Sequence, residues 1–311
     1  MASNKIKKSL AKRLAPIILR VNKFLENNTT IINYLIEKRH QANDSYNFES
    51  ELKKLLKDKR LIALDAGSQG GFNSDIFFPK LYEKYFNPIL VDPIKDQTNL
   101  EGNKYINKGL WSSKGNKKLF VLGKRLGSSS MYEPDKNSIR ISGFKEKDFH
   151  LFDVTETKNI ECDTINNCLK NLKINSLDFL KIDTQGAELE ILKGLGFYKP
   201  LLIKCEVQIH SIYKNTPSWT ELLNFLNKLN YIVCDWRTIG PHVTRAPVEM
   251  DMIFVPNFLK DEGKRIILDR EEEFISLMLI CGQIKLLKKI SEIIGFKNNE
   301  SYIKLKDKYF S

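Results

Sequence analysis

The amino-acid sequence predicts a doubly wound α/β fold built around a mostly parallel β-sheet. From residue 61 onward, short apolar runs alternate with helical patterns, and strands that alternate with helices form parallel sheets. The apolar runs end in polar or glycine-rich residues, as strands do where they meet a turn. Three of the runs carry an aspartate at or next to their carboxyl end, which is the edge where open α/β sheets bind ligands.

Six segments have the length and the apolar content of buried strands. They are residues 61–65, 88–92, 177–183, 200–207, 231–236 and 249–255. We therefore expect three parts in the chain. These are a basic helical N-terminal extension over 1–60, a core domain over 61–256 and a C-terminal helical extension over 257–311.

Composition limits the class of protein. Hydrophobic residues make up 42% of the chain and charged residues 28%, a balance that closes a core and excludes wholesale disorder. The net charge of +12 suits an anionic partner, but lysines spread along the chain suit an ordinary lysine-rich protein equally well. Five cysteines without a CxxC pair predict reduced thiols. With no membrane-length apolar run and no leader pattern, the prediction is a cytoplasmic protein.

Both terminal extensions have apolar stripes at helical spacing. Residues 1–27 form a basic amphipathic pattern, and we expect its apolar face to pack on the core, with an anionic membrane surface as the alternative. Near the C-terminus, Phe274, Met278 and Leu287 belong to a broad apolar stripe. We expect this stripe to cover the flank of the domain, with a homodimer interface as the alternative.

A glycine-rich turn follows the first predicted strand. Glycines at this position let the backbone approach a ligand and place free N–H groups of a following helix against it. The spacing excludes the dinucleotide pattern G-x-G-x-x-G, because Gln69 and Phe72 occupy two of the required positions. It matches Asp-x-Gly-x-x-x-Gly, with Asp65, Gly67 and Gly71, the arrangement by which S-adenosylmethionine enzymes hold the methionine end. The alternative is an ordinary tight turn.

Asp92 closes the second predicted strand. An acidic side chain at this place can accept both hydrogen bonds of a ribose diol. A helix cap or a solvated turn residue is the alternative role, and Pro93 is compatible with it. Together with the glycine turn, the position favours ribose binding.

The segment LDFLKIDTQGAELEILKGL, residues 177–195, closely resembles the signature segment of the FkbM-type methyltransferases. The matching positions are Lys181, Ile182, Asp183, Gly186, Ala187, Glu188, Leu189 and Gly194. Thr184 and Gln185 stand where that family commonly has Val-Glu. The resemblance extends over roughly residues 61–256, with a weaker echo in LGSSSMYE at 126–133, and it leaves both extensions uncovered.

This resemblance implies the class I methyltransferase fold, a Rossmann-like seven-stranded and mostly parallel sheet, with S-adenosylmethionine as methyl donor. It also implies an oxygen acceptor on a glycan, a lipid-linked sugar or another small-molecule hydroxyl. Methyl transfer is an in-line displacement that needs alignment and exclusion of water, and a base adds a smaller factor. The candidates for this catalytic role are Asp183, Glu206 and His210. A divalent Mg or Mn ion held by the same three residues is an alternative, as is a plain loop role for His210.

Other functional classes remain to be weighed. A dehydrogenase is disfavoured by the glycine spacing. A nucleic-acid methyltransferase is disfavoured because the chain has neither an Asp/Asn-Pro-Pro-aromatic motif after the fourth strand nor a Pro-Cys nucleophile. The alternative from a different class is a non-catalytic binding protein on the same fold, membrane-peripheral or associated with nucleic acid, which would bind no cofactor.

Overall fold

A computed structural model describes residues 47–75, 77–94, 104–142, 144–239 and 248–296, together with Tyr302 and Asp307. The amphipathic pattern of residues 1–27 lies outside these ranges. From Phe48 onward the chain belongs to one unit. Within the described ranges, no helix has the length and apolar character needed to cross a membrane.

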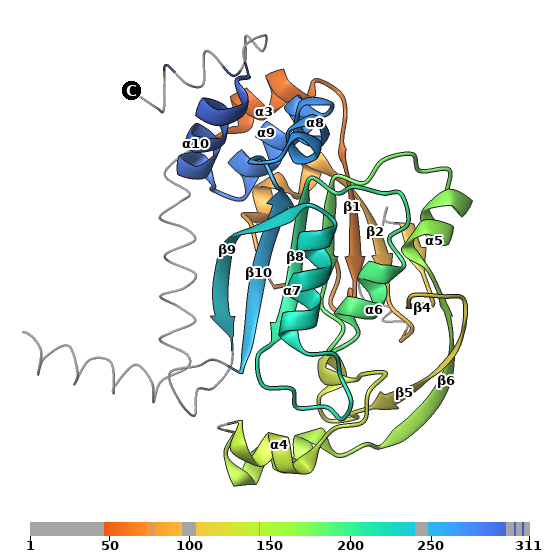
Figure 1. The fold of residues 1–311 in the computed structure, drawn as a ribbon. Coiled ribbons are helices and arrows are strands. Elements are labelled where there is room, and N and C mark those ends of the chain that lie inside the picture. Colours follow the sequence, from red (N-terminus) through yellow and green to blue (C-terminus); the bar gives the residue numbers. More distant parts are fainter. Residues whose placement is uncertain are drawn as a thin grey trace, which may run out of the picture. The chain divides into compact units, whose positions relative to one another are not determined.

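Seven strands form the central sheet (Figure 1). They are β1 Leu61–Ala66, β2 Phe86–Val91, β3 Lys104–Ile106, β7 Phe179–Ile182, β8 Leu202–Gln208, β9 Tyr231–Ile239 and β10 Glu249–Pro256. Their order is β3-β2-β1-β7-β8-β10-β9. The strand β10 is antiparallel to both of its neighbours, and the other pairs are parallel. The predicted fold class is confirmed, and all six predicted strands are present.

The strand order reverses at β1. The chain passes from β1 to β2 on one side of it, and β7 later pairs with its other side. Asp65, near the end of β1, stands in register with Leu90 of β2 and Lys181 of β7. A reversal of this kind opens a crevice at the carboxyl ends of the strands, where open α/β sheets bind their ligands.

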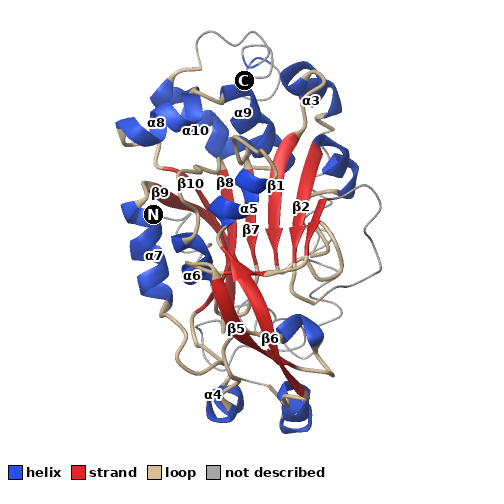
Figure 2. Ribbon diagram, turned by 90° about the vertical axis from the view of Figure 1, so that its right-hand side faces the viewer, coloured by secondary structure: helices blue, strands red, loops and turns tan. Residues whose placement is uncertain are grey.

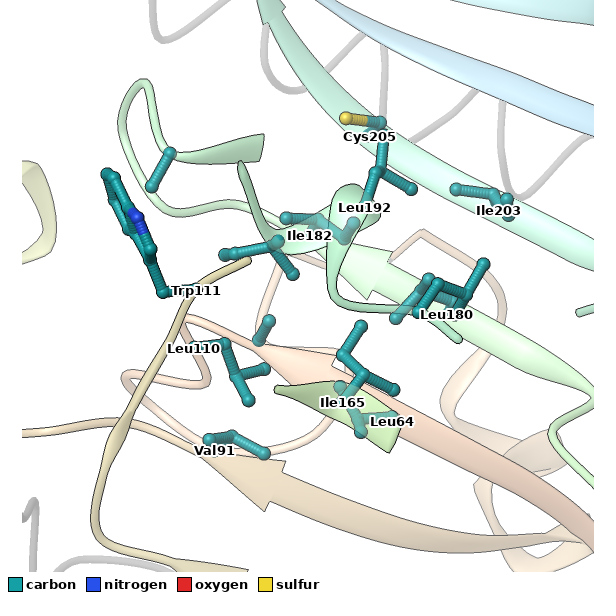
Figure 3. Close-up of a cluster of buried hydrophobic side chains, with 14 of the residues drawn as sticks. Leu64, Val91, Leu110, Trp111, Ile165, Leu180, Ile182, Leu192, Ile203 and Cys205 are labelled. Carbon is teal, nitrogen blue, oxygen red and sulfur yellow. The ribbon is translucent and has the colours of Figure 1, made fainter. Parts of the chain in front are cut away.

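Helices cover one face of the sheet through a cluster of buried side chains (Figure 3). The helices are α5 Ile165–Asn171, α6 Glu188–Lys193 and α7 Trp219–Lys228. Leu64, Leu180 and Ile203 point to this cluster from adjacent strands, and Leu192 meets them from α6. Strands that are buried on both faces read as continuous apolar runs, which is why the sequence pattern located them.

The opposite face packs against segments from both ends of the chain. These are α3 Glu49–Leu56, the 3₁₀ helix η1 Lys80–Tyr85, α8 Asp261–Leu268, α9 Glu271–Ile280 and α10 Ile284–Ile294. The helices α3, α8, α9 and α10 gather at the end of the sheet where β1 begins (Figure 1). Phe274, Met278 and Leu287 are fully buried in this core. The C-terminal apolar stripe is therefore packed inside the chain's own fold.

A second sheet was not predicted. It comprises β4 Gly109–Leu110, β5 Gly115–Val121 and β6 Glu156–Asp163 in the order β4-β6-β5. Between β5 and β6 lie η2 Leu126–Ser128, α4 Lys136–Ile141 and η3 Glu146–Phe152. The strands β5 and β6 lie beyond the carboxyl ends of β1 and β7 (Figure 2). This sheet places a wall beside the crevice.

The connection from β1 to β2 corrects one expectation. The sequence predicted a helix directly after the glycine turn. Residues 67–75 and 77–79 instead form turns and loop, and the first helical element is the 3₁₀ helix η1. Three glycines of this turn, Gly67, Gly70 and Gly71, have positive φ angles. The left-handed backbone that they adopt interrupts an α-helix, so the turn folds back on itself.

Candidate active site

The end of β1 is fixed by a buried ion pair. Asp65 is fully buried, and its Oδ1 lies 3.1 Å from Nζ of Lys181, the adjacent residue on β7. Burial raises the pKa of Asp65, and the Lys181 ammonium opposes this shift. Burial alone would lower the pKa of Lys181, but the carboxylates of Asp65 and Asp183 outweigh it and raise that pKa. The pair ties the ends of two central strands together.

Gly67 follows β1 and touches the end of β7. It has a φ of +79°, and a Cβ added there would lie 1.8 Å from the carbonyl oxygen of Asp183. The amide of Asp183 donates to the carbonyl of Ala66 at 3.0 Å. A side chain at position 67 would therefore separate the two turns that form the floor of the crevice.

A pocket of about 600 Å³, part of it open to solvent, lies at this floor. Gly67, Asp92 and Asp183 line it, and so do apolar side chains from the second sheet and its neighbours. Those apolar residues are Ile94, Leu110, Leu119, Leu126 and Met131.

Asp92 lies at the pocket wall just past β2. Its Oδ1 accepts the N–H of Ile94 at 2.7 Å, and its carbonyl accepts the Tyr105 hydroxyl at 2.9 Å. The amide of Asn107 donates to the same carbonyl. These bonds fix the aspartate in place while its side chain remains part of the pocket lining.

Asp183 and Glu206 are brought together by Gln185. The Gln185 Nε2 donates to Oδ1 of Asp183 at 3.2 Å and to Oε1 of Glu206 at 2.7 Å. The other oxygen of Asp183 lies 3.9 Å from Nζ of Lys181. The Asp183 side chain is 27% exposed and lines the pocket, whereas Glu206 is buried.

The two buried glutamates near Asp183 differ from ordinary carboxyls. Burial and the neighbouring Asp183 carboxylate raise the pKa of Glu206 well above its usual value. Burial also raises the pKa of Glu249 to about 7, although the Arg125 guanidinium opposes that shift. Both therefore carry their protons to a higher pH than exposed glutamates do. Burial thus disfavours the charged form of Glu206, which meets Asp183 through Gln185.

Glu188 closes the turn that carries Asp183. Its Oε1 accepts the N–H groups of Thr184 and Gly186 and the Thr184 hydroxyl, all at 3.0 to 3.1 Å. Glu188, the first residue of α6, thus holds the turn that precedes the helix. The turn itself is strained, because Gln185 has a φ of +60°.

The predicted site residues thus divide into three groups. Gly67, Asp92 and Asp183 line one pocket. Asp65 and Glu206 lie behind its wall, attached through Lys181 and Gln185. The third group does not line the pocket.

Gly71 and His210 make up that third group. Gly71 donates its amide to the carbonyl of Ser68 inside the turn, which is a structural role. The His210 side chain is exposed, and its backbone amide donates to the carbonyl of Val248. Within the described ranges no three His, Cys, Asp or Glu side chains are grouped so as to hold a metal ion.

Sequence reasoning missed the wall built by residues 126–131. Leu126, Gly127, Ser129, Ser130 and Met131 all line the pocket. The sequence did mark this stretch, because it belongs to the LGSSSMYE segment that weakly resembles the FkbM-type pattern. The segment could not be placed in the fold from the sequence, because short polar and glycine-containing segments have no hydrophobic periodicity. Gln185 was missed because the resemblance marked it only as a departure from the family pattern.

Comparison with solved structures gives two weak likenesses. The structure of LepI in complex with SAM shares 12% identity at a TM-score of 0.29, over 66% of this chain and 46% of that one. This chain thus spans less than half of the length of LepI. The second is the 1,6-didemethyltoxoflavin-N1-methyltransferase of Burkholderia thailandensis, bound to 1,6-didemethyltoxoflavin and S-adenosylhomocysteine. It shares 10% identity at a TM-score of 0.26, over 74% of this chain and 89% of that one. At these TM-scores neither likeness carries the assignment.

Sequence comparison is more decisive. No curated protein matches the chain. The family model described as the methyltransferase FkbM domain matches residues 77–233, half of the chain. The matched region contains β7, the turn that carries Asp183, and most of the pocket lining. The chain therefore belongs to the FkbM methyltransferase family.

Proposed function

We propose that the chain transfers a methyl group from S-adenosylmethionine to an oxygen of a glycan, a lipid-linked sugar or another small-molecule hydroxyl. The observation that carries this proposal is the single pocket lined by Gly67, Asp92 and Asp183. These residues come from the carboxyl ends of three adjacent parallel strands on either side of the reversal at β1. That is the place where an α/β sheet binds a nucleotide-like ligand.

The pocket residues fit the chemistry of the donor. An adenine ring needs apolar contacts, and Ile94, Leu110 and Leu119 are among the side chains that offer them. A ribose diol needs an acceptor, which Asp92 provides at the end of β2. The methionine end needs close backbone approach, which the absence of a side chain at Gly67 allows.

The donor supplies a methyl group attached to a positively charged sulfur. The chain's part is to align the acceptor oxygen with that methyl and to exclude water. Asp183 is the one predicted catalytic residue that lines the pocket, and it can orient an acceptor hydroxyl and take its proton. Glu206 lies behind Asp183 and is joined to it through the Gln185 amide. His210 does not line the pocket, and this proposal assigns it no step.

Isothermal titration calorimetry tests the donor assignment. We expect the purified chain to bind S-adenosylmethionine and S-adenosylhomocysteine but not NAD. Asp92→Ala should weaken binding by about 1 to 3 kcal/mol, because the ribose loses its acceptor. Asp58→Ala, an exposed aspartate at the opposite end of β1, is the matched control and should leave binding unchanged. Binding of NAD with no response to S-adenosylhomocysteine would reject the proposal.

Turnover tests the acceptor chemistry. Transfer of isotope-labelled methyl to a panel of glycans, lipid-linked sugars and small alcohols should label at least one hydroxyl. With that acceptor, Asp183→Asn should reduce turnover by about a hundredfold, while S-adenosylhomocysteine affinity changes little. Near-normal turnover of this variant would show that another residue handles the acceptor proton.

A further inference from the structure

Gln185 occupies the centre of the site's polar contacts. The residue is 8% exposed, and its side-chain amide nitrogen meets carboxyl oxygens of both Asp183 and Glu206. An amide NH₂ has two donors, so one N–H serves each carboxyl. Because carboxylate oxygens accept hydrogen bonds, the nitrogen end of the amide faces them.

Tyr213 holds the other end of the same amide. Its hydroxyl lies 3.0 Å from Oε1 of Gln185 and 2.7 Å from the carbonyl oxygen of Ser128, and these two acceptors share its single proton. Tyr213 is buried, so water does not compete for the bond. The orientation of Gln185 is thus determined from both ends of its amide.

The backbone of Gln185 is held as firmly as its side chain. The Ser130 hydroxyl donates to its carbonyl oxygen at 2.7 Å, and Glu188 anchors the residues on either side of it. Left-handed φ angles at residues other than glycine persist where surrounding contacts impose them, and such strained positions cluster at functional sites. Here the contacts tie the Asp183 turn to the wall made by residues 126–131.

Asp183 is in turn held at both of its oxygens. Gln185 binds Oδ1, and Lys181, itself anchored by Asp65, faces Oδ2. Glu206 is the second carboxyl on Gln185, and burial with the adjacent Asp183 charge raises its pKa. Of these two carboxyl groups, Asp183 is the one that lines the pocket.

We infer that Gln185 is a positioning residue, oriented by Tyr213, which holds the Asp183 carboxylate at the pocket floor so that its charge favours the positively charged sulfur of the donor. This inference rests on the proposed function. It adds that the pocket distinguishes S-adenosylmethionine from S-adenosylhomocysteine by charge. The two molecules differ by one methyl group and one positive charge, so the ratio of their affinities reports the field at the sulfur.

Calorimetry with these two probes on the full chain gives a test that needs no acceptor. Asp183→Asn should lower the preference for S-adenosylmethionine over S-adenosylhomocysteine on the order of tenfold, the effect of losing one partly exposed charge. Gln185→Met, which keeps the length but removes both donors, should lower the preference in the same direction by about threefold or more. Tyr213→Phe, which removes only the orienting hydroxyl, should lower it by a smaller factor.

Tyr198→Phe provides the matched control. Tyr198 is a buried tyrosine whose hydroxyl donates to the carbonyl of Ile174, away from the pocket, and its variant should keep the wild-type preference. An unchanged preference in both Gln185→Met and Tyr213→Phe would overturn the positioning role, and an unchanged preference in Asp183→Asn would overturn the charge effect. Failure of the wild-type chain to bind either probe would instead reject the proposed function.

Discussion

Gly67 is the residue on which the shape of the site depends most directly. A Cβ at this position would overlap the carbonyl oxygen of Asp183. Because that oxygen belongs to a backbone held by the amide bond to Ala66, it cannot swing aside as a flexible side chain could. The same glycine thus permits the close approach of two strand ends and leaves room for a ligand above them.

Gly67→Ala should therefore abolish binding of S-adenosylhomocysteine and lower the melting temperature. Gly70→Ala is the matched control, because Gly70 has a similar positive φ of +84° but its nearest neighbour is the side chain of Ser74 at 3.3 Å. The control loses only the backbone preference, on the order of 1 to 2 kcal/mol, and keeps binding. Equal behaviour of the two variants in melting and calorimetry would show that the overlap with Asp183 is relieved by movement elsewhere.

Glu249 should make stability depend on pH. Its pKa in the folded chain is about 7, above the value of an unfolded glutamate, about 4.3. Between these two values the folded state binds more protons than the unfolded state, so stability falls as pH rises through this window and levels off above it. Glu249→Gln should flatten the fall in melting temperature between pH 5 and pH 8.

Glu133→Gln is the control for this pH effect, because Glu133 lies at the surface with a side chain that is 50% exposed. We expect it to retain the wild-type dependence on pH. Glu206 adds a fall of the same sign, since burial raises its pKa as well. A slope in Glu249→Gln equal to that of the wild type would mean that Glu249 ionises in the folded chain as readily as in the unfolded one.

At the residue scale, the sequence predicted which residues stand at strand ends but not where their side chains are directed. Asp92 and Asp183 follow visible apolar runs, so their place at the crevice was predictable from strand ends alone. Asp65 occupies the same kind of position, yet its side chain is directed to Lys181 and is fully buried. The direction of a side chain at a strand end depends on its partner in the neighbouring strand, 116 residues away, and local pattern does not contain that information.

At the element scale, the helix α7 shows local sequence and structure in agreement. Ser218 and Glu221 form a capping box, in which the Ser218 hydroxyl accepts the amide of Glu221 and the glutamate accepts the amide of Ser218. The helix begins at Trp219, whose side chain lines a small second pocket with Gly186 and Glu188. The cap therefore sets where this helix starts relative to the Asp183 turn.

Ser218→Ala should cost about 1 kcal/mol in the free energy of unfolding, because an N–H at the helix start loses its acceptor. Urea denaturation measures this change. Ser218→Asp keeps an acceptor and adds a negative charge at the helix N-terminus, which the helix dipole favours, so it should retain the wild-type value. A loss in the aspartate variant as large as that in the alanine variant would place the effect elsewhere than in the cap.

Elements that face solvent were harder to predict. Strand β6 exposes five of its eight residues and β5 three of its seven, so GNKKLFV and ETKNIECD show no long apolar run. They pair through their backbones in an antiparallel ladder, and cross-strand pairing is a long-range property. The helix expected directly after β1 is absent for a local reason. Three glycines of that turn adopt left-handed backbone angles, which an α-helix does not accommodate.

At the scale of the whole molecule, the pocket and the helices of the C-terminal part of the core lie at opposite ends of the sheet. The pocket lies at the carboxyl ends of the parallel strands, while α8, α9 and α10 pack where β1 begins (Figure 1). In α9 every residue from Phe274 to Ile280 is buried. A helical stretch that is buried on all sides belongs to the interior of a fold, so α9 and its neighbours α8 and α10 complete the core.

Met278→Ala should therefore destabilise the chain without changing the chemistry of the pocket. Met278 is fully buried, and removing a large side chain from a packed core costs about 2 to 5 kcal/mol through lost contacts and the cavity left behind. We expect a lower melting temperature with unchanged affinity for S-adenosylhomocysteine at temperatures where the variant is folded. Ile293→Ala is the matched control in the neighbouring helix α10, since Ile293 is 46% exposed and should change stability little. If Met278→Ala melted like the wild type, α9 would not be part of the cooperative core. If the variant weakened binding of S-adenosylhomocysteine, the two ends of the sheet would be coupled.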